Sequence, residues 1–543
     1  MYGLYMNFRK YLQQNPHLLL LIIIVLFIIL IIGRPYNLLV NDDGIFIRNV
    51  KNFYEGNFSL HPLTAPTFYL QALTGFITTK IFGFTFENLR ILNIFFAFLS
   101  SLLIFSLIKS ITKNKLAGLL VALSFVSNPF FWFLSYSYMT EIHFILFATI
   151  ALFSFYKYLQ NNSYSNVILT SIAVSLLFLV RQIGLIFAIS FFLSIIITNK
   201  KITKKDLIIV FLPVLTFFWY QNFSITVEYA EAGITETLKN FFDYSFMINI
   251  FFKRLFDSSV YIGLFSFPLI PIIILNKRFK FSIKTFLLPT LIALPFIIKL
   301  IQKLLGHFTF PTLQNVFTFK GFYPSAIPST DRFVNYPLIY NLHTSLLIIG
   351  VISFVVLIYL IFININILKK LEKPNKTIFI ATTLNLLFIT LLTLAFRAVY
   401  DRYIYLLFFL LLFPVSLIIK NKINNFALVL TACCLIIFSS TSIIFEKDYI
   451  SWNQKRNEII TFATNQYNQS VCDIEGSGEW EDYLYYECKD IQDQLKKTLR
   501  ISWQDSDQIE NQQYIKLQEF PFKSYLGKQE NKLYLLQKIN NEN

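Results

Sequence analysis

Two adjacent carboxylates, Asp42 and Asp43, follow the first long apolar run of the chain, which covers residues 18–32. Charged side chains beside a membrane-spanning segment are costly to keep near lipid, so they commonly serve a function. A positioned carboxylate can take a proton from a hydroxyl group while that group attacks an electrophile. Neighbouring side chains point in different directions, so we expect one of the two to act, with Asp42 as the first choice. The alternative is that the pair caps the helix that follows, because aspartate favours helix N-termini.

A second acidic position, Glu141, lies at the start of another apolar run. We expect it to position a substrate or to share a proton with the aspartates, and the alternative is a helix-capping carboxylate at the membrane interface. His61 and Tyr403 are expected to position substrate. For His61 this means supporting its loop, whereas Tyr403 has membership of an aromatic belt as its alternative.

Arginine is suited to bind a phosphate group, because its planar guanidinium stays charged and donates paired hydrogen bonds. The candidates beside apolar runs are Arg402, Arg90 and Arg397, followed by Arg181. An internal ion-pair cluster that includes Asp401 is the alternative for Arg397 and Arg402. For Arg181 the alternative is a simple anchor at the membrane interface.

The composition is that of an integral membrane protein. Hydrophobic residues make up 55% of the 543 residues, charged residues 14%, and the mean hydropathy is +0.57; soluble domains carry about 25% charged residues. The net charge of +16 is unevenly distributed, because the chain from Glu446 onward carries 12 Lys and Arg against 17 Asp and Glu. That leaves +21 for the first 445 residues, where the basic residues form short clusters between apolar runs. Such clusters mark cytoplasmic loops, so nucleic acid is not needed to explain the charge.

These clusters fix an expected topology with the N-terminus in the cytoplasm. A span needs about 20 apolar residues, which predicts about 13 transmembrane helices, near residues 17–33, 88–108, 116–136, 140–158, 166–180, 183–198, 206–222, 255–275, 285–303, 343–367, 377–396, 403–419 and 425–445. The segment 63–82 contains several threonines, a glutamine and a lysine. Counting it as a span would place the later lysines outside, so we interpret it as a juxtamembrane helix in the first outer loop, residues 34–87.

The composition changes at Glu446, which divides the chain into a transmembrane domain, 1–445, and an extracytoplasmic domain, 446–543. A helix is expected near residues 450–465, and alternating residues near 513–517 and 532–536 predict strands, giving a small α+β domain. Cys472 and Cys488 lie in it, on the side of the membrane where disulfides persist. The sequence is equally consistent with a disulfide between these two cysteines and with two free thiols.

Several signatures of other chemistry are missing from the sequence. It has no G-x-x-x-x-G-K-[ST], no G-x-G-x-x-G after a strand, and no H-E-x-x-H, which removes support for nucleotide-driven transport and soluble-nucleotide chemistry. No spacing of cysteine and histidine resembles a zinc site. We expect no cofactor and no metal, although the Asp42-Asp43 pair leaves a divalent ion possible.

Five segments together resemble the GT-C superfamily of membrane glycosyltransferases, which use polyprenyl-phosphate sugars and include protein O-mannosyltransferases and lipid A aminoarabinose transferase. They are Asp42-Asp43-Gly44, His61-Pro62-Leu63, Glu87-Asn88-Leu89-Arg90, Met139-Thr140-Glu141 and Tyr400-Asp401-Arg402-Tyr403. The region 452–485 also resembles the tail of bacterial members. The aminoarabinose branch has a lysine beside its proline pair, whereas residues 61–66 here read His-Pro-Leu-Thr-Ala-Pro.

The resemblance implies an inverting glycosyltransferase of the inner membrane, transferring a hexose or pentose on the extracytoplasmic face. Its partners would be membrane lipid, a polyprenyl-phosphate-linked sugar and a glycan, lipid or protein acceptor. Asp42 or Asp43 would be the base, Glu141 the second acidic site, and Arg402, Arg90 and Arg397 the contacts to the donor phosphate. A secondary transporter or lipid flippase, or a non-catalytic assembly protein, are the alternatives. A transporter would be expected to centre its site on helices broken near the middle of the membrane.

Overall fold

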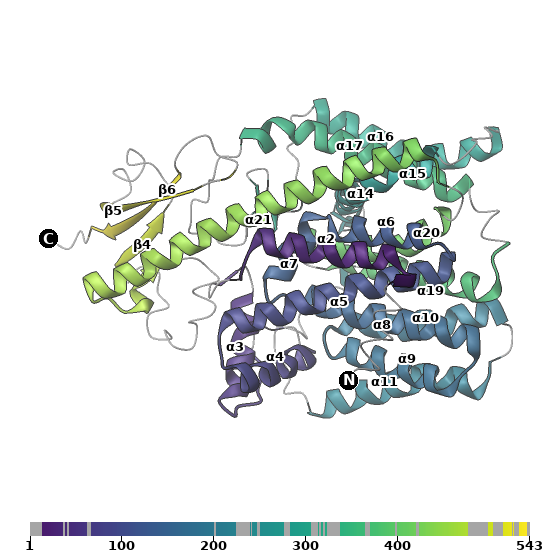
Figure 1. The fold of residues 1–543 in the computed structure, drawn as a ribbon, viewed down its shortest axis with the longest axis horizontal. Helices are drawn as coiled ribbons and strands as arrows, with labels where there is room; N and C mark the ends of the chain where they lie inside the picture. The colour runs from purple at the N-terminus through teal and green to yellow at the C-terminus, as the bar shows by residue number, and fades with distance from the viewer. Residues whose placement is uncertain are drawn as a thin grey trace.

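The computed structural model describes residues 13–35, 39–40, 43–61, 64, 67–199, 202–223, 239–240, 242–246, 250–275, 283–305, 313, 316–318, 321–322, 337–363, 370–396, 399–419, 423–475, 498–502, 514–523, 525 and 531–539. Helices dominate this part of the chain and run side by side in a bundle (Figure 1). The longer ones are α2 (Pro16–Ile32), α3 (Asp43–Tyr54), α4 (Tyr69–Phe82), α5 (Phe86–Thr112), α6 (Lys115–Val126), α7 (Pro129–Tyr136), α8 (Thr140–Asn161), α9 (Tyr164–Phe178), α10 (Leu185–Asn199), α11 (Lys204–Phe223), α14 (Phe252–Ser266), α15 (Ile270–Leu275), α16 (Ile283–Leu305), α17 (Pro337–Ile363), α19 (Lys373–Ala395), α20 (Asp401–Ile418) and α21 (Asn425–Tyr467).

Every expected span falls on a helix or on a pair of consecutive helices. In the described part of the chain, eight helices are long and apolar enough to cross a bilayer, or nine if α6 and α7 form one span. Helices α2 and α9 are apolar but shorter, so the number of 13 crossings stays a prediction. The polytopic helical fold itself is confirmed.

The span expected near 116–136 is broken into α6 and α7, which meet at an angle of 63°. Pro129 cannot continue a helix from the preceding turn, and the Asn128 side chain starts a new one by accepting a hydrogen bond from the Phe130 amide. The break points the chain that follows α7 towards α4 and α5.

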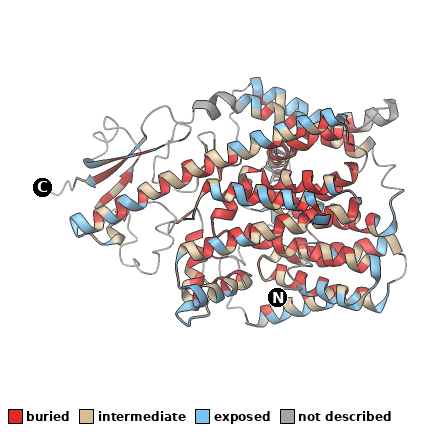
Figure 2. Cartoon of the chain, viewed as in Figure 1, coloured by how far each residue is buried: buried red, intermediate tan, exposed pale blue. Residues whose placement is uncertain are grey.

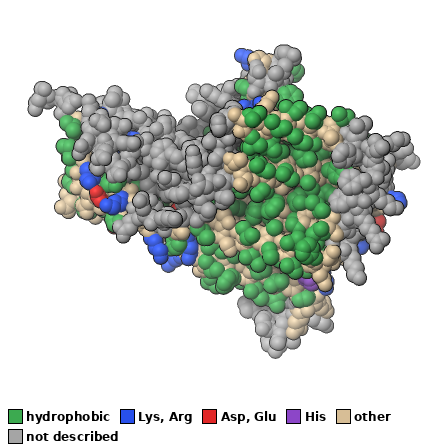
Figure 3. All heavy atoms as spheres, turned by 90° about the horizontal axis from the view of Figure 1, so that it is seen from above, with side chains coloured by type: hydrophobic (Ala, Val, Ile, Leu, Met, Phe, Trp, Pro, Cys, Tyr) green, Lys and Arg blue, Asp and Glu red, His purple; other side chains and the backbone are tan. Residues whose placement is uncertain are grey.

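Buried residues gather in the interior of the bundle, where α20 is buried along almost its whole length (Figure 2). Apolar residues also cover the outside, and Figure 3 shows a broad hydrophobic surface over the helices at the top of Figure 1. In α16 these include Leu291, Ile298 and Leu305. An apolar exterior around an apolar interior is the pattern of helices that face lipid.

Helices α14 and α17 cross at close range. A methyl group added to Gly263 would meet the Gly350 carbonyl oxygen at 1.9 Å, so no larger side chain fits there. Small residues at helix crossings let two backbones approach, and this is the common way to pack helices in lipid.

Basic residues from distant segments come together at one end of the bundle. Lys113, after α5, pairs with Glu372 before α19, and Lys115 donates to the Gln14 carbonyl before α2. Lys205 of α11 donates to the Asn162 carbonyl after α8. These lysine-bearing connections, which were expected to be cytoplasmic, therefore share one end of the described molecule.

Helix α21 is continuous across residue 446 and is 43 residues long, which corresponds to about 65 Å at 1.5 Å per residue. The hydrocarbon core of a bilayer is about 30 Å thick, so α21 projects well beyond it. The helix expected near 450–465 is its projecting part rather than a separate element.

The tail ends in a four-stranded sheet with the order β3-β4-β6-β5, formed by β3 (Ile474–Glu475), β4 (Leu499–Ser502), β5 (Tyr514–Phe522) and β6 (Asn531–Lys538). Strand β6 pairs antiparallel with β4 and β5. A two-stranded hairpin, β1 (Phe317–Thr318) and β2 (Gly321–Phe322), lies between α16 and α17 in the sequence. The sheet packs on α21, where the Phe462 and Phe520 rings are 5.3 Å apart and Ser451 donates to the Lys523 carbonyl.

Candidate active site

The candidate site lies at the end of the bundle opposite the basic loops, where several helices begin. Asp43 is the first residue of α3, Glu141 the second of α8, and Arg402 the second of α20. Arg90 lies in the second turn of α5, and Arg181 directly precedes the short 3₁₀ turn that joins α9 to α10.

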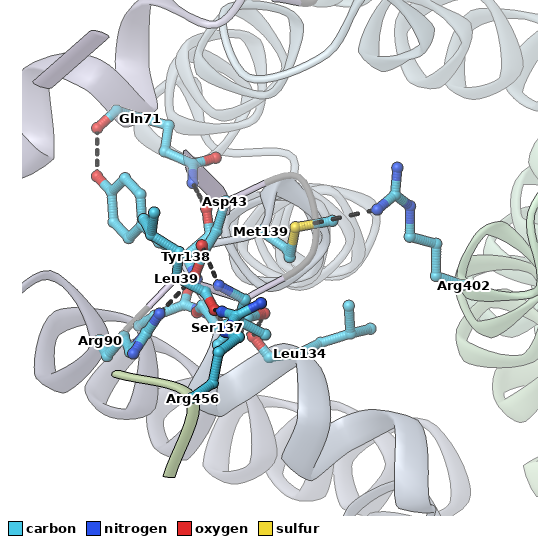
Figure 4. A network of polar contacts seen from close by, with 12 residues as sticks. Leu39, Asp43, Gln71, Arg90, Leu134, Ser137, Tyr138, Met139, Arg402 and Arg456 are labelled. Carbon is cyan, nitrogen blue, oxygen red and sulfur yellow. Dashed lines mark hydrogen bonds and ion pairs between the residues drawn. The ribbon is translucent and has the colours of Figure 1, made fainter. Parts of the chain in front are cut away.

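Asp43 is fully buried in a network of polar contacts (Figure 4). Its Oδ2 atom is 2.9 Å from Arg90 Nη2 and accepts a hydrogen bond from the Tyr138 amide at 3.3 Å. Its Oδ1 atom accepts from the Val40 amide at 2.7 Å. Burial raises the pKa of this carboxyl group, and Arg90 opposes the shift. The alternative expected from the sequence was that the aspartates cap the following helix. The Asp43 carboxylate instead accepts from the amides of Val40, in the loop before α3, and of Tyr138.

Two side chains hold the connection between α7 and α8 in place. Gln71 of α4 donates to the Tyr138 carbonyl, and the Tyr138 hydroxyl donates back to the Gln71 carbonyl, at 2.9 and 2.8 Å. Asn93 of α5 donates to the carbonyls of Leu134 and Ser137. The connection is therefore held by α4 and by α5. It links Tyr138, which contacts Asp43, to Glu141 three residues later.

Glu141 is buried between two arginines. Its Oε1 atom is 3.1 Å from Arg181 Nη1 and 3.6 Å from Arg402 Nε, while its Oε2 atom has no hydrogen-bond partner among the described residues. Arg402 Nη1 also lies 3.9 Å from the Met139 sulfur. Glu141 thus brings two guanidinium groups together, and guanidinium groups are donors that suit an anionic ligand.

Tyr403 completes this cluster. The guanidinium carbons of Arg181 and Arg402 lie 4.8 and 5.4 Å from the centre of its ring. Arg402 also lies 5.1 Å from the ring centre of Tyr400. The rings hold the two arginines through cation–π contact, so Tyr403 is more than a member of an aromatic belt.

The two halves of the site are close to each other. Asp43 contacts Tyr138, three residues before Glu141, and three residues span at most about 11 Å even when fully extended. In Figure 4 Arg90 and Arg402 lie on either side of Tyr138 and Met139. Acidic and basic side chains from α3, α5, α8 and α20 therefore converge on one short connection.

His61 is buried beside α3, and its amide donates to Asn49 Oδ1 at 2.6 Å. The Asn49 amide nitrogen in turn donates to the Thr64 hydroxyl. Burial, with a further contribution from Arg48, lowers the pKa of His61 to about 4. The burial of His61 and its backbone contact to Asn49 fit a role in supporting the loop, which stays a prediction.

Three of the residues expected at the site lie outside the described residues: Asp42, Arg397 and Cys488. Cys472 is disulfide-bonded, and Cys488 is the partner expected from the sequence. Asp401 is buried and accepts hydrogen bonds from the amides of Val316 and Phe317. It thus anchors the segment that carries β1, a contact that the expected Arg397–Asp401–Arg402 cluster did not include.

Sequence reasoning ranked Arg181 below Arg90 as a binding residue, and the geometry reverses that order. Arg90 is enclosed in an ion pair with Asp43, whereas Arg181 faces Glu141 and Tyr403. The signal in the sequence was the short break between two apolar runs at residues 181–182. Within the described ranges, no group of three His, Cys, Asp or Glu side chains is placed to hold a metal ion.

An apolar helical bundle with a buried acid–arginine network at one end defines a polytopic membrane protein with a candidate site at that end. Residues 66–220 match the family model of the dolichyl-phosphate-mannose-protein mannosyltransferases. The match covers α4 to α11 and so includes Arg90, Glu141 and Arg181. It confirms, for this part of the chain, the resemblance to GT-C glycosyltransferases. No curated protein matches by sequence.

Solved structures of two enzymes are similar to the chain over most of its length. The oligosaccharyltransferase AglB from Archaeoglobus fulgidus, in complex with an inhibitory peptide and a dolichol-phosphate, has a TM-score of 0.43 and 12% identity, over 91% of this chain and 70% of that chain. ArnT from Cupriavidus metallidurans, bound to undecaprenyl phosphate, has 0.39 and 10%, over 95% and 97%. The archaeal enzyme tethered to an acceptor peptide has 0.39 and 13%, over 88% and 59%.

Proposed function

We propose that this protein is an inverting membrane glycosyltransferase that takes a sugar from a polyprenyl phosphate on the extracytoplasmic face of the inner membrane. The observation that carries the proposal is the convergence of the Asp43 network with the Glu141–Arg181–Arg402 cluster on residues 137–141. The family match over residues 66–220 supports the same class of reaction. The position of the cluster at helix starts also favours an enzyme of this kind over a transporter with a site at the middle of the membrane.

Asp42 is the proposed base. Asp43 directs both carboxylate oxygens to Arg90 and to two backbone amides, so the neighbouring aspartate is the one we assign to the acceptor. As the acceptor oxygen forms a bond to the anomeric carbon, the bond from that carbon to the phosphate oxygen breaks, and the hydroxyl proton passes to the carboxylate. A single displacement of this kind inverts the anomeric centre.

The departing phosphate gains one negative charge in this step, and Arg402 and Arg181 are assigned to stabilise it. Both approach Glu141, which helps to hold the two guanidinium groups in place. Tyr403 orients the same two arginines, and His61 supports the loop that carries the base. Arg397 remains a further predicted phosphate contact, whereas Arg90 is assigned to holding Asp43. The sugar is a hexose or pentose, and the acceptor is a glycan, a lipid or a protein.

Transfer from radiolabelled polyprenyl-phosphate sugars in isolated membranes tests the proposal. Asp42→Asn is expected to lower turnover by about 100-fold or more, as loss of a general base typically does. Glu55→Gln removes an exposed carboxylate just after α3 and is the matched control, expected to keep wild-type turnover. Full turnover by the double variant Asp42→Asn/Asp43→Asn would contradict the assignment of the base.

A further inference from the structure

A buried arginine in the C-terminal helix contacts the loop that carries the aspartates. Arg456 Nη2 lies 2.7 Å from the carbonyl oxygen of Leu39, across 417 positions of the chain. Arg456 is 3% exposed and Leu39 is 2% exposed. The contact is part of the network around Asp43 (Figure 4).

Packing alone does not explain an arginine at this position. Its guanidinium lies 4.9 Å from the ring of Trp452, one turn earlier in α21, and an apolar side chain would fill the same space without the cost of burying a charge. What arginine adds is a directed donor to the Leu39 carbonyl. Its place in the fold therefore points to control of the loop backbone.

The contact reaches Asp43 in one step. The Val40 amide, which follows Leu39, donates to Asp43 Oδ1, and the Asp43 amide donates back to the Val40 carbonyl at 3.1 Å. Asp43 in turn pairs with Arg90, and Glu446 of α21 interacts electrostatically with that arginine. The residues that flank Asp42 are thus held by α21 at one end and by the α5 ion pair at the other.

Helix α21 itself is held by the tail. The Tyr525 amide donates to Asp448 Oδ1 at 2.6 Å, and Ser451 donates to the Lys523 carbonyl at 2.8 Å. We propose that Arg456 is a positioning residue, through which α21 and the sheet packed on it fix the backbone around the Asp42–Asp43 pair for transfer. This inference rests on the proposed function, because the pair is assigned there as the source of the base.

Kinetics of the full-length protein in membranes give the first test. Arg456→Met keeps the length and apolar contact of the side chain but removes the donor. We expect kcat for transfer to fall by about 10- to 100-fold, since a displacement of about 1 Å can cost that much, while the donor KM changes by less than about twofold. Arg456→Lys retains a cationic donor and is expected to restore part of kcat.

Lys455→Met is the matched control, because it removes the neighbouring positive charge, which pairs with Glu458 on the surface of α21. It is expected to leave both kinetic constants unchanged. If Arg456→Met fails to fold, Arg456→Gln, whose side chain is too short to keep the 2.7 Å contact, replaces it with the same expected result.

Hydrogen exchange of the Val40 amide, measured on the purified protein, gives a readout that does not depend on transfer. We expect faster exchange in Arg456→Met than in wild type and Lys455→Met. Wild-type kcat together with wild-type exchange in Arg456→Met would overturn the inference. If the wild-type protein transfers no sugar, the proposed function fails, and the exchange measurement still decides whether Arg456 holds the loop.

Discussion

Asp43 is held in a buried ion pair with Arg90, and the strength of that pair can be measured. Asp43→Asn would remove the carboxylate that lies 2.9 Å from the buried Arg90 guanidinium, and breaking a buried ion pair typically costs about 3–5 kcal/mol. We expect a clear fall in Tm of the detergent-purified protein. In Asp43→Asn/Arg90→Gln the two losses should not add, because both variants remove the same interaction. Strict additivity would show that the pair is not coupled.

Arg181 and Arg402 should act on donor binding rather than on the base. Arg181→Gln and Arg402→Gln are each expected to lower kcat/KM for the donor by about tenfold or more, because a charge-assisted bond to the phosphate is worth about 1.5–3 kcal/mol. Steady-state transfer kinetics with a polyprenyl-phosphate sugar measure the change. Arg254→Gln is the control, since Arg254 donates to carbonyls at the end of α19 instead. An unchanged kcat/KM in both variants would remove this pair from the phosphate site.

His61 provides a prediction for pH dependence. Its pKa of about 4 in the folded protein lies below the ordinary value of 6.5, so protonation favours the unfolded state. This contribution to stability is complete above pH 6.5 and is lost as the pH falls towards 4, up to about 3 kcal/mol. Tm of the wild type should therefore fall more steeply over this window than Tm of His61→Gln. Parallel curves would show that His61 is not buried in its neutral form.

The sequence identified residue types at the site better than it identified partners. Acidic and basic residues beside apolar runs were expected because charge is costly near lipid, and Glu141 and Arg402 indeed meet. The pairing of Asp43 with Arg90 and of Arg456 with Leu39 joins residues 47 and 417 positions apart. Neither hydropathy nor residue spacing predicts such contacts, because the contacts depend on how the helices pack.

At the scale of elements, hydropathy predicted where helices lie but not where they bend or continue. The α6–α7 break follows from Asn128, which caps the new helix, and Pro129, which starts it. Both residues are visible in the sequence, but the apolar run around them led us to expect one continuous span. The change in composition at residue 446 suggested a boundary, yet α21 runs through it. A helix that passes from lipid into water carries different residue types in the two surroundings, but the helix itself can continue.

The α14–α17 crossing makes an element-scale prediction. Gly263→Ala would place a methyl group 1.9 Å from the Gly350 carbonyl oxygen, so the helices must separate. Overpacking of this kind costs about 1–3 kcal/mol, and Tm should fall accordingly. Ser258→Ala in the same helix is the control, since its hydroxyl makes no hydrogen bond within the described residues. Equal Tm values for both variants would contradict the close crossing.

At the scale of the whole molecule, the structure separates two kinds of charge. The lysine-rich connections, including Lys113 with Glu372 and Lys205 beside Asn162, lie at one end. The acid–arginine cluster and the projecting part of α21 lie at the other (Figure 1). By the positive-inside rule the lysine-rich end faces the cytoplasm, which would place the candidate site and the tail outside.

Cysteine labelling tests this orientation directly. Lys113→Cys and Glu458→Cys place thiols at well-exposed positions near opposite ends of the molecule, one after α5 and one on the projecting part of α21. A membrane-impermeant maleimide should reach Glu458→Cys in cells with a permeabilised outer envelope, and Lys113→Cys only after the inner membrane is opened. The wild-type protein corrects for reaction at Cys433 and Cys434, which are free. The reverse labelling pattern would place the Asp43 network in the cytoplasm, where a lipid donor facing outward could not reach it, and the proposed reaction would have to be abandoned.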